Sequence, residues 1–151
     1  MRRLLMKHRE FISRLAHERI HAAIHEAEQK ISGEIRVMVS HQRAPDPLVA
    51  AQQAFLRLGM KQTKHRNAVL IFVAPRSRTF AVIGDEAVHA KCGDTFWREL
   101  ADAMTGHFKR GEFTAGLVHG ISQAGKLLAV HFPREPAEQN KRSGNSVEDR
   151  P

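Results

Sequence analysis

The sequence contains no tyrosine and a single cysteine among its 151 residues. That residue, Cys92, cannot form an internal disulfide, and the chain has no second cysteine with which to build a redox or zinc pair. Aromatic residues make up only 6% of the chain, so a core has to be built mainly from aliphatic side chains. We therefore interpret Cys92 as a small buried apolar residue and expect a reducing compartment.

Long uncharged apolar runs are also missing. No window approaches the run of about eighteen apolar residues that a membrane-spanning helix needs. Residues 1–9 begin with positive charge, but charge returns after a short apolar run and no small-residue cleavage site follows, unlike in a secretion signal. We therefore expect a cytoplasmic protein without a transmembrane segment.

Carboxylates are scarce in the middle of the chain. The formal net charge is +8, and no Asp or Glu lies between Asp46 and Asp85. A basic surface of this kind attracts anions, so we expect an anionic ligand or a protein partner. Nucleic acid is a further alternative that no motif supports, and a surface that only keeps the protein dissolved is another. The cations in this stretch are Arg57, Lys61, Lys64, Arg66, Arg76 and Arg78.

The spacing of apolar residues predicts a single domain over residues 1–133. From residue 134 onward there is no apolar periodicity, so we expect 134–151 to be a disordered tail. Runs of β-branched residues predict strands, and apolar residues three or four apart predict helices. In chain order we expect a helix over 7–31, a strand over 34–40, a helix over 47–58, strands over 69–73 and 79–83, and helices over 86–92, 94–108 and 113–128.

This order of elements predicts an α/β fold, an αβα sandwich with a small mixed sheet covered by helices. The strands at 34–40 and 69–73 are joined by a helix, so they should be parallel through a right-handed crossover. The strands at 69–73 and 79–83 are separated by a tight turn and should form an antiparallel hairpin. The continuous apolar run Val69–Val73 predicts a central strand that is covered on both faces.

Such a sheet separates the candidate residues into two ends. At the carboxyl end of the parallel pair we expect His41, Arg43, Arg76, Ser77 and Arg78. Open α/β sheets usually bind ligands there, and the guanidinium fork suits phosphate or carboxylate. Arg43, Arg76 and Arg78 are therefore candidate anion-binding residues. The alternative is that they are solvated charges on turns.

Asp85 and Glu86 follow the last predicted strand and should lie at the opposite end of the sheet. They are candidate acid or metal-binding groups. Lys64, His65 and Arg66 fall at the same end, so surface ion pairing is the simpler alternative. A metal ion needs several converging oxygen ligands, and we assign no metal site.

Ten histidines raise a separate metal hypothesis. The run His17-Glu18-Arg19-Ile20-His21 matches the His-Glu-x-x-His pattern of zinc proteases, but no third ligand follows at the expected spacing. We interpret this run as a helix edge at the solvent boundary. No nucleophile and base are recognisable as a triad, and the catalytic residues, if any, stay unknown; the side chains considered are Ser77, Thr79, His89 and Ser122.

Four segments resemble a known family. They are AEQKISGEIRVMV (27–39), AFLRLGMKQTKHRNAVLIFVAPRSRTFAVIGDEAVH (54–89), FW (96–97) and HFKRGEFTAGLVHGI (107–121). Together they resemble the TPM domain, a family that includes a plant thylakoid-lumen protein and many bacterial proteins. The resemblance covers about residues 10–133 and rests on the asparagine before the central strand, the arginine in the turn and the glycine after the third strand.

The resemblance implies an α/β sandwich with helices on both sides of a small mixed sheet. It also implies calcium binding, which some members show, and acid phosphatase activity, which is associated with the plant member together with photosystem II repair. Family members often carry Asp-Asp-Arg in the turn between the central strands. The matching turn here is Pro75–Arg78, with Arg76 and Ser77 in place of the acids, and this exchange argues against calcium at the turn.

We therefore expect a non-catalytic binding module with a basic surface. One alternative is a phosphatase in which Asp85 and Glu86 act as acid or metal groups while Arg76 and Arg78 hold the phosphate. Another is weak association of the basic body with an anionic polymer or membrane surface, which salt would weaken.

Overall fold

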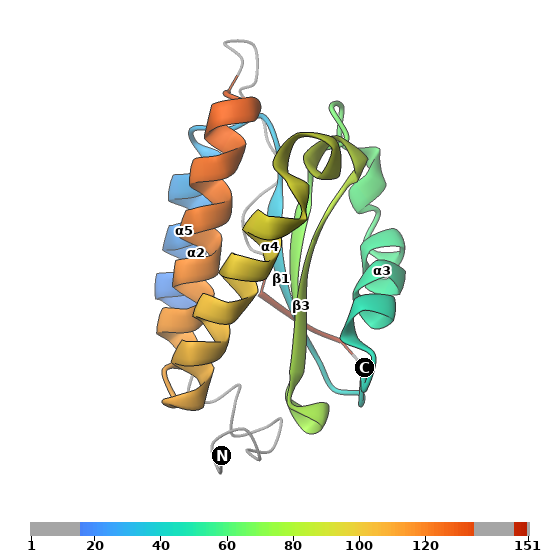
Figure 1. Cartoon of the computed structure of the whole chain (residues 1–151), viewed down its shortest axis with the longest axis vertical. Helices are drawn as coiled ribbons and strands as arrows, with labels where there is room; N and C mark the ends of the chain where they lie inside the picture. The colour runs from blue at the N-terminus through green and yellow to red at the C-terminus, as the bar shows by residue number, and fades with distance from the viewer. Residues whose placement is uncertain (1–15, 135–146, 151) are drawn as a thin grey trace.

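The computed structural model describes residues 16–134 and the backbone of residues 147–150 (Figure 1). A sheet lies between two helical layers. One layer contains α2 (His17–Glu28), α4 (Glu86–Lys109) and α5 (Phe113–His131), and the other contains α3 (Pro47–Arg57). The predicted αβα sandwich is therefore confirmed.

The sheet has the strand order β3-β2-β1-β4. β1 (Ile35–Ser40) and β2 (Val69–Ala74) are parallel, and β2 pairs antiparallel with β3 (Thr79–Gly84). The short 3-10 helix η3 (Pro75–Ser77) forms the turn of this hairpin. Every residue of β2 is buried, which confirms the prediction of a central strand covered on both faces.

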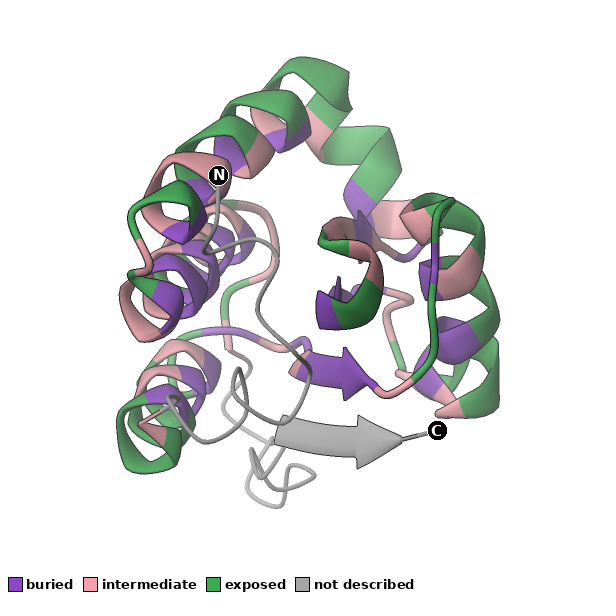
Figure 2. Ribbon diagram, turned by 90° about the horizontal axis from the view of Figure 1, so that it is seen from below, coloured by how far each residue is buried: buried purple, intermediate pink, exposed green. Residues whose placement is uncertain are grey.

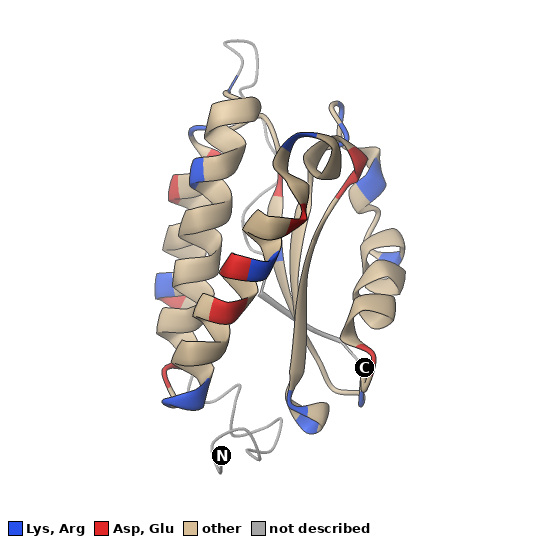
Figure 3. Cartoon of the chain, in the orientation of Figure 1, with Lys and Arg blue, Asp and Glu red and all other residues tan. Residues whose placement is uncertain are grey.

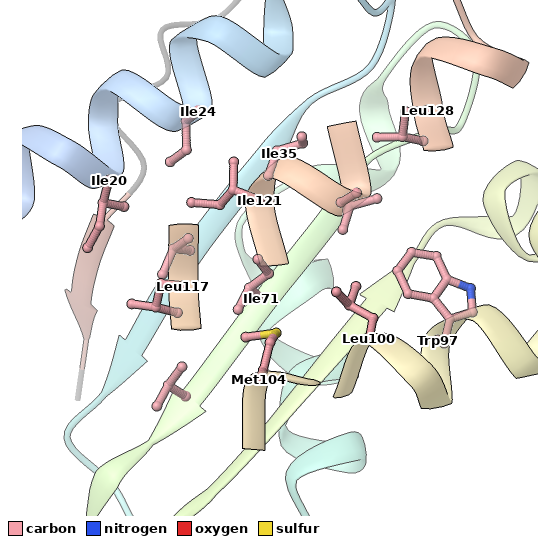
Figure 4. Packing of buried hydrophobic residues seen from close by; sticks show 14 of the residues in the cluster. Ile20, Ile24, Ile35, Ile71, Trp97, Leu100, Met104, Leu117, Ile121 and Leu128 are labelled. Atoms are coloured by element: carbon pink, nitrogen blue, oxygen red, sulfur yellow. The ribbon is translucent and has the colours of Figure 1, made fainter. Parts of the chain in front are cut away.

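The strand side chains alternate between two hydrophobic clusters, as expected for a pleated sheet. Val37, Val39, Ile71 and Val73 face the larger cluster, which α2, α4 and α5 supply with aliphatic side chains. In Figure 4, Ile20 and Ile24 of α2 and the labelled residues of α5 and α4 gather over Ile35 and Ile71. Met38, Leu70 and Phe72 face the smaller cluster under α3. Burial is therefore concentrated along the inner faces of the helices, as Figure 2 shows.

Two element boundaries bear on the sequence predictions. Gly93 has φ 74° and ψ 167°, so it breaks α4 between a short first helix and a longer second one, as the separate helices over 86–92 and 94–108 predict. The predicted helix over 7–31 is present as α2, and its part before residue 16 lies outside the described residues. Within the part of the chain that the structure describes, no helix is long and apolar enough to cross a membrane.

The tail differs from the prediction at one place. Residues 147–150 form β4 (Val147–Arg150), which pairs parallel with β1 in the register Val37↔Val147, whereas the sequence predicts no regular structure there. Its sequence, Val-Glu-Asp-Arg, has no apolar pattern to reveal a strand. The strand forms because the edge of β1 away from β2 offers backbone N–H and C=O groups that a short extended segment can pair with. Residues 135–146 and 151 lie outside the described residues.

Close packing at the amino end of the sheet fixes the approach of the chain into β1. A Cβ atom on Gly33 would lie 2.6 Å from the backbone oxygen of Asn67, and backbone cannot move aside as a flexible side chain can. The Asn67 side chain is fully buried and donates to the Ser32 hydroxyl at 3.1 Å. A glycine is therefore required at residue 33 for steric reasons.

Replacing this glycine should destabilise the fold. We expect Gly33→Ala to lower the free energy of unfolding by about 1–3 kcal/mol, the usual cost of overpacking. Gly106→Ala is the matched control, because Gly106 lies in α4 with only the Arg110 side chain near its missing Cβ, and it should gain about 0.5–1 kcal/mol of helix propensity. Urea denaturation of both variants measures the difference, and equal effects would contradict the packing argument.

Candidate functional site

At the carboxyl end of β1 and β2, hydrogen bonds hold the loop after β1 against the hairpin turn. The Ser77 hydroxyl accepts from the Ala44 N–H at 2.7 Å, and the Thr79 hydroxyl donates to the Ala44 C=O at 2.6 Å. These two hydrogen bonds join the loop after β1 to the hairpin turn. The Arg76 guanidinium adds a third connection by donating to the His41 C=O at 3.4 Å. The predicted gathering of residues from both loops at this end is what the structure shows.

Arg43, Arg76 and Arg78 are all exposed at this end. Among the described residues, none of the three forms an ion pair with a carboxylate. The acidic neighbour in the same loop, Asp46, caps α3 instead, accepting from the Val49 N–H at 3.3 Å. We name the surface formed by Arg43, Arg76 and Arg78 the arginine rim. Its guanidinium groups carry charge that nothing in the described structure neutralises.

The amino end of the hairpin is organised differently, around the buried carboxylate of Asp85. This residue is 4% exposed and is the N-cap of α4, where its Oδ1 accepts from the Glu86 N–H at 2.7 Å. Arg66 Nε donates to Asp85 Oδ2 at 2.9 Å and its Nη2 donates to Oδ1 at 3.3 Å. The hydrogen bond to Asp85 raises the pKa of Arg66 above its ordinary value. Asp85 is therefore a structural anion with both oxygens engaged.

Arg66 also holds the neighbouring elements together. Its backbone is left-handed, with φ 54°, and its C=O accepts from the Ala87 N–H in the first turn of α4 at 3.2 Å. Arg66 Nη1 lies 3.4 Å from the Glu86 carboxylate, which is exposed. The expectation of ion pairing at this end is therefore met, although Asp85 takes part from a buried position rather than from the surface.

The two ends of the hairpin are too far apart to act on one small substrate. The register pairs Ala74 with Thr79 at one end and Val69 with Gly84 at the other. Six residues of extended chain separate these pairs by about 17 Å at roughly 3.4 Å per residue. A phosphate held by the arginine rim would therefore lie well away from Asp85 and Glu86.

The residues present do not fit a calcium site. The hairpin turn has Arg76 and Ser77 where family members often carry acids, and the Asp85 oxygens already bind Arg66 and the α4 N-terminus. Calcium takes six to eight oxygen ligands, several of them carboxylates. Within the described residues no three His, Cys, Asp or Glu side chains are placed to hold a metal ion.

The other titratable side chains of interest lie on or next to the helices. His17, Glu18 and His21 are all exposed on α2. Burial raises the pKa of the Cys92 thiol, which lowers its reactivity at neutral pH. His107 Nδ1 lies 2.8 Å from the Glu112 carboxylate, and this contact, with that of Arg110, holds the pKa of Glu112 below its usual range.

Sequence reasoning did not identify the burial of Glu28 on α2. It is 5% exposed, and its Oε2 accepts from the Ile35 N–H at the start of β1 at 2.8 Å. A signal for it was present, because Glu28 continues the spacing of four residues from Ile20 to Ile24, both fully buried. An acid at an apolar position of a helix indicates a buried hydrogen-bonding role.

Comparison with known proteins agrees with the resemblance to the TPM domain. The TPM domain matches residues 5–127. The BA42 protein of the psychrophilic bacterium Bizionia argentinensis, solved by NMR, is 36% identical, with 89% of this chain and 95% of that chain covered and a TM-score of 0.79. The N-terminal domain of the cg2496 protein from Corynebacterium glutamicum is 18% identical over 83% of this chain and 79% of that one, with a TM-score of 0.56, and shows the fold alone. No curated protein matches.

Removal of the buried carboxylate should weaken the fold. We expect Asp85→Ala to lower the free energy of unfolding by about 1–2 kcal/mol through loss of the N-cap, with a further loss because Arg66 loses its main partner. Glu86→Gln is the control, because this side chain is 71% exposed and its ion pair is screened by solvent. If chemical denaturation finds Asp85→Ala as stable as the parent chain, the structural role of this carboxylate is wrong.

Proposed function

The chain belongs to the TPM domain family, and from that premise we propose that it is a non-catalytic binding module that recognises an anionic partner through the arginine rim. The observation that supports this proposal is the uneven neutralisation of charge at the two ends of the hairpin. Arg66 at the amino end is paired with Asp85 and Glu86, whereas Arg43, Arg76 and Arg78 have no carboxylate partner among the described residues.

The loops that carry the arginine rim are preorganised for binding. Hydrogen bonds from Ser77 and Thr79 to Ala44 brace the two loops that carry it, so less ordering is needed when a ligand binds. Arginine offers paired N–H donors to phosphate or carboxylate oxygens. The chemistry that fits is an anion presenting several oxygens, on a small molecule or on an acidic segment of a protein partner.

Phosphatase activity is the alternative that the family resemblance raises, and the geometry argues against it. Asp85 and Glu86 lie at the amino end of the hairpin and the arginine rim at the carboxyl end. Asp85 is committed to Arg66 and to the α4 N-cap. Asp46, the acid in the loop beside the rim, caps α3, and within the described residues no metal-ligand set lies there. The candidate acids Asp85 and Glu86 therefore lie away from the place where the arginines would hold phosphate. General association with a nucleic acid or an anionic membrane surface is a second alternative, distinguished by equal dependence on all exposed cations.

Anion binding by the rim is tested with inorganic pyrophosphate as the probe, using calorimetry or NMR titration at about 0.15 M salt. We expect Arg43→Gln, Arg76→Gln and Arg78→Gln each to weaken binding about 1.5- to 5-fold, the usual range for one exposed charge contact. Arg57→Gln is the control, because Arg57 is an exposed cation at the far end of α3. Equal losses in all four variants would mean that the probe is held by nonspecific attraction to positive charge and not by the rim. Absence of binding in the parent chain would overturn the proposal.

The lack of catalysis is tested separately. Purified protein should not hydrolyse p-nitrophenyl phosphate in the presence of calcium, of magnesium or of a chelator, because the candidate acids Asp85 and Glu86 lie at the other end of the hairpin from the arginine rim. An Asp85→Ala variant tested in parallel identifies contaminating activity, since a contaminant does not respond to the substitution. Turnover that survives purification and disappears in an Asp85→Ala variant shown by urea denaturation to be folded under the assay conditions would establish the phosphatase in place of the binding module.

A further inference from the structure

The outward side of α3 carries apolar residues where a surface helix usually carries charge. Ala51, Ala54 and Phe55 are buried and face the sheet. An α-helix turns about every 3.6 residues, so residues seven apart lie on nearly one line along it. Val49 and Leu56 have this spacing, lie on the side away from the sheet and are 45% and 59% exposed. The line of an amphipathic helix that faces solvent is normally charged or polar, so this line is an exception.

Exposed large apolar residues are concentrated on this helix. Among the described residues there are four, and three of them are on α3. The fourth, Val130, lies near the end of α5 in the other helical layer. The other exposed residues of α3 before Arg57 are two neutral glutamines. We name the whole uncharged surface the α3 ridge: Leu48, Val49, Gln52, Gln53 and Leu56.

Positive charge flanks the ridge at both ends. The arginine rim lies in the loop that leads into α3 and in the hairpin turn that is braced against this loop. At the other end, Arg57 is the last residue of the helix, and Lys61 follows in the short 3-10 helix η2 (Met60–Gln62). Figure 3 shows the tan length of α3 between the positive hairpin turn and these positive residues. Asp46 is the one carboxylate in residues 41–84, and it caps α3 through the Val49 N–H.

An apolar ridge between two groups of cations matches the chemistry of an anionic membrane surface. Lipid phosphates attract lysine and arginine, and aliphatic side chains enter the boundary between headgroups and acyl chains. A second copy of the chain would bring the same cations against these ones, so charge opposes it. Protein partners are commonly anchored by aromatic side chains, and the aromatic residue of α3, Phe55, is only 4% exposed. A lipid surface therefore fits the ridge and both groups of cations together.

We propose that α3 lies flat on an anionic membrane surface, with the α3 ridge inserted among the lipids and the flanking cations bound to lipid phosphates. The proposal rests on the anion binding proposed for the arginine rim and names lipid headgroups as the source of the anion. In the described part of the chain, α3 is the single α-helix on its face of the sheet, so it can meet a flat surface before the sheet does (Figure 1). The contact differs from general attraction to positive charge because it requires the ridge.

Co-sedimentation with vesicles in about 0.15 M salt tests the proposal. We expect the parent chain to bind vesicles of equimolar phosphatidylglycerol and phosphatidylcholine, and not vesicles of phosphatidylcholine alone. The double variant Val49→Gln/Leu56→Gln should weaken binding about tenfold, because two aliphatic side chains no longer leave water. Val130→Gln is the matched control and should leave binding unchanged, since Val130 is 74% exposed on α5. Urea denaturation of each variant checks that the fold is intact.

Charge variants test the orientation of the contact. Arg57→Gln should weaken vesicle binding about fivefold, the usual contribution of one cation near an anionic surface. Lys126→Gln removes an exposed cation from α5 and should have little effect. Equal losses in these two variants would show general attraction and overturn the oriented contact. Full binding by the Val49→Gln/Leu56→Gln variant, or no binding of the parent chain to the anionic vesicles, would also overturn it.

Insertion of the ridge has a separate optical readout. The fluorescence of a Leu56→Trp variant should shift to the blue on anionic vesicles and be quenched by phosphatidylglycerol with brominated acyl chains. A Val130→Trp variant should show neither change. Absence of both changes in Leu56→Trp would overturn insertion, and an acidic protein that binds the ridge of a chain that ignores vesicles would identify a different class of partner.

Pyrophosphate titration without vesicles separates this proposal from the anion binding on which it rests. The Val49→Gln/Leu56→Gln and Arg57→Gln variants should bind pyrophosphate like the parent chain, because these residues lie outside the arginine rim. A parent chain that binds pyrophosphate but not vesicles overturns the membrane contact alone. A parent chain that binds vesicles through the ridge but does not bind pyrophosphate overturns the rim as a site for free anions and leaves the membrane contact supported.

Discussion

Burial of β2 on both faces is the constraint on which the rest of the molecule depends. All six of its residues are covered, by α2, α4 and α5 on one side and by α3 on the other. A strand in that position cannot carry charge along its length, because an unpaired buried charge is costly. The charged side chains of the hairpin are therefore confined to its two ends.

Each end of the hairpin handles charge in its own way. At the amino end, Arg66, Asp85 and Glu86 pair with one another. At the carboxyl end, Ser77 and Thr79 brace the turn and Arg76 donates to the His41 C=O, but among the described residues no carboxylate neutralises the arginines. A fold that braces a turn with neutral groups leaves its cations available to a ligand. This difference, rather than the total charge of the chain, is what supports the proposed anion binding at the carboxyl end.

Most of the fold could be predicted from the sequence, because its patterns are strong where the core is. Local structural requirements are visible in a single sequence at three places: the apolar run Val69–Val73, the turn after it and Gly93. β4 could not be predicted, since its pairing depends on the edge of β1 and not on its own residues. The two ends of the candidate site followed from topology, but the burial of Asp85 did not, because burial is decided by α4 folding back over the strand.

The contacts between Arg66, Asp85 and the first turn of α4 have a consequence for local motion. The side chain of Arg66 donates to Asp85, while its backbone C=O accepts from Ala87, so the loop and the helix start bind each other in both directions. Neither can open alone without leaving a buried carboxylate or a backbone group unsatisfied. The amino end of the hairpin therefore behaves as one cooperative opening unit rather than as a fraying helix terminus.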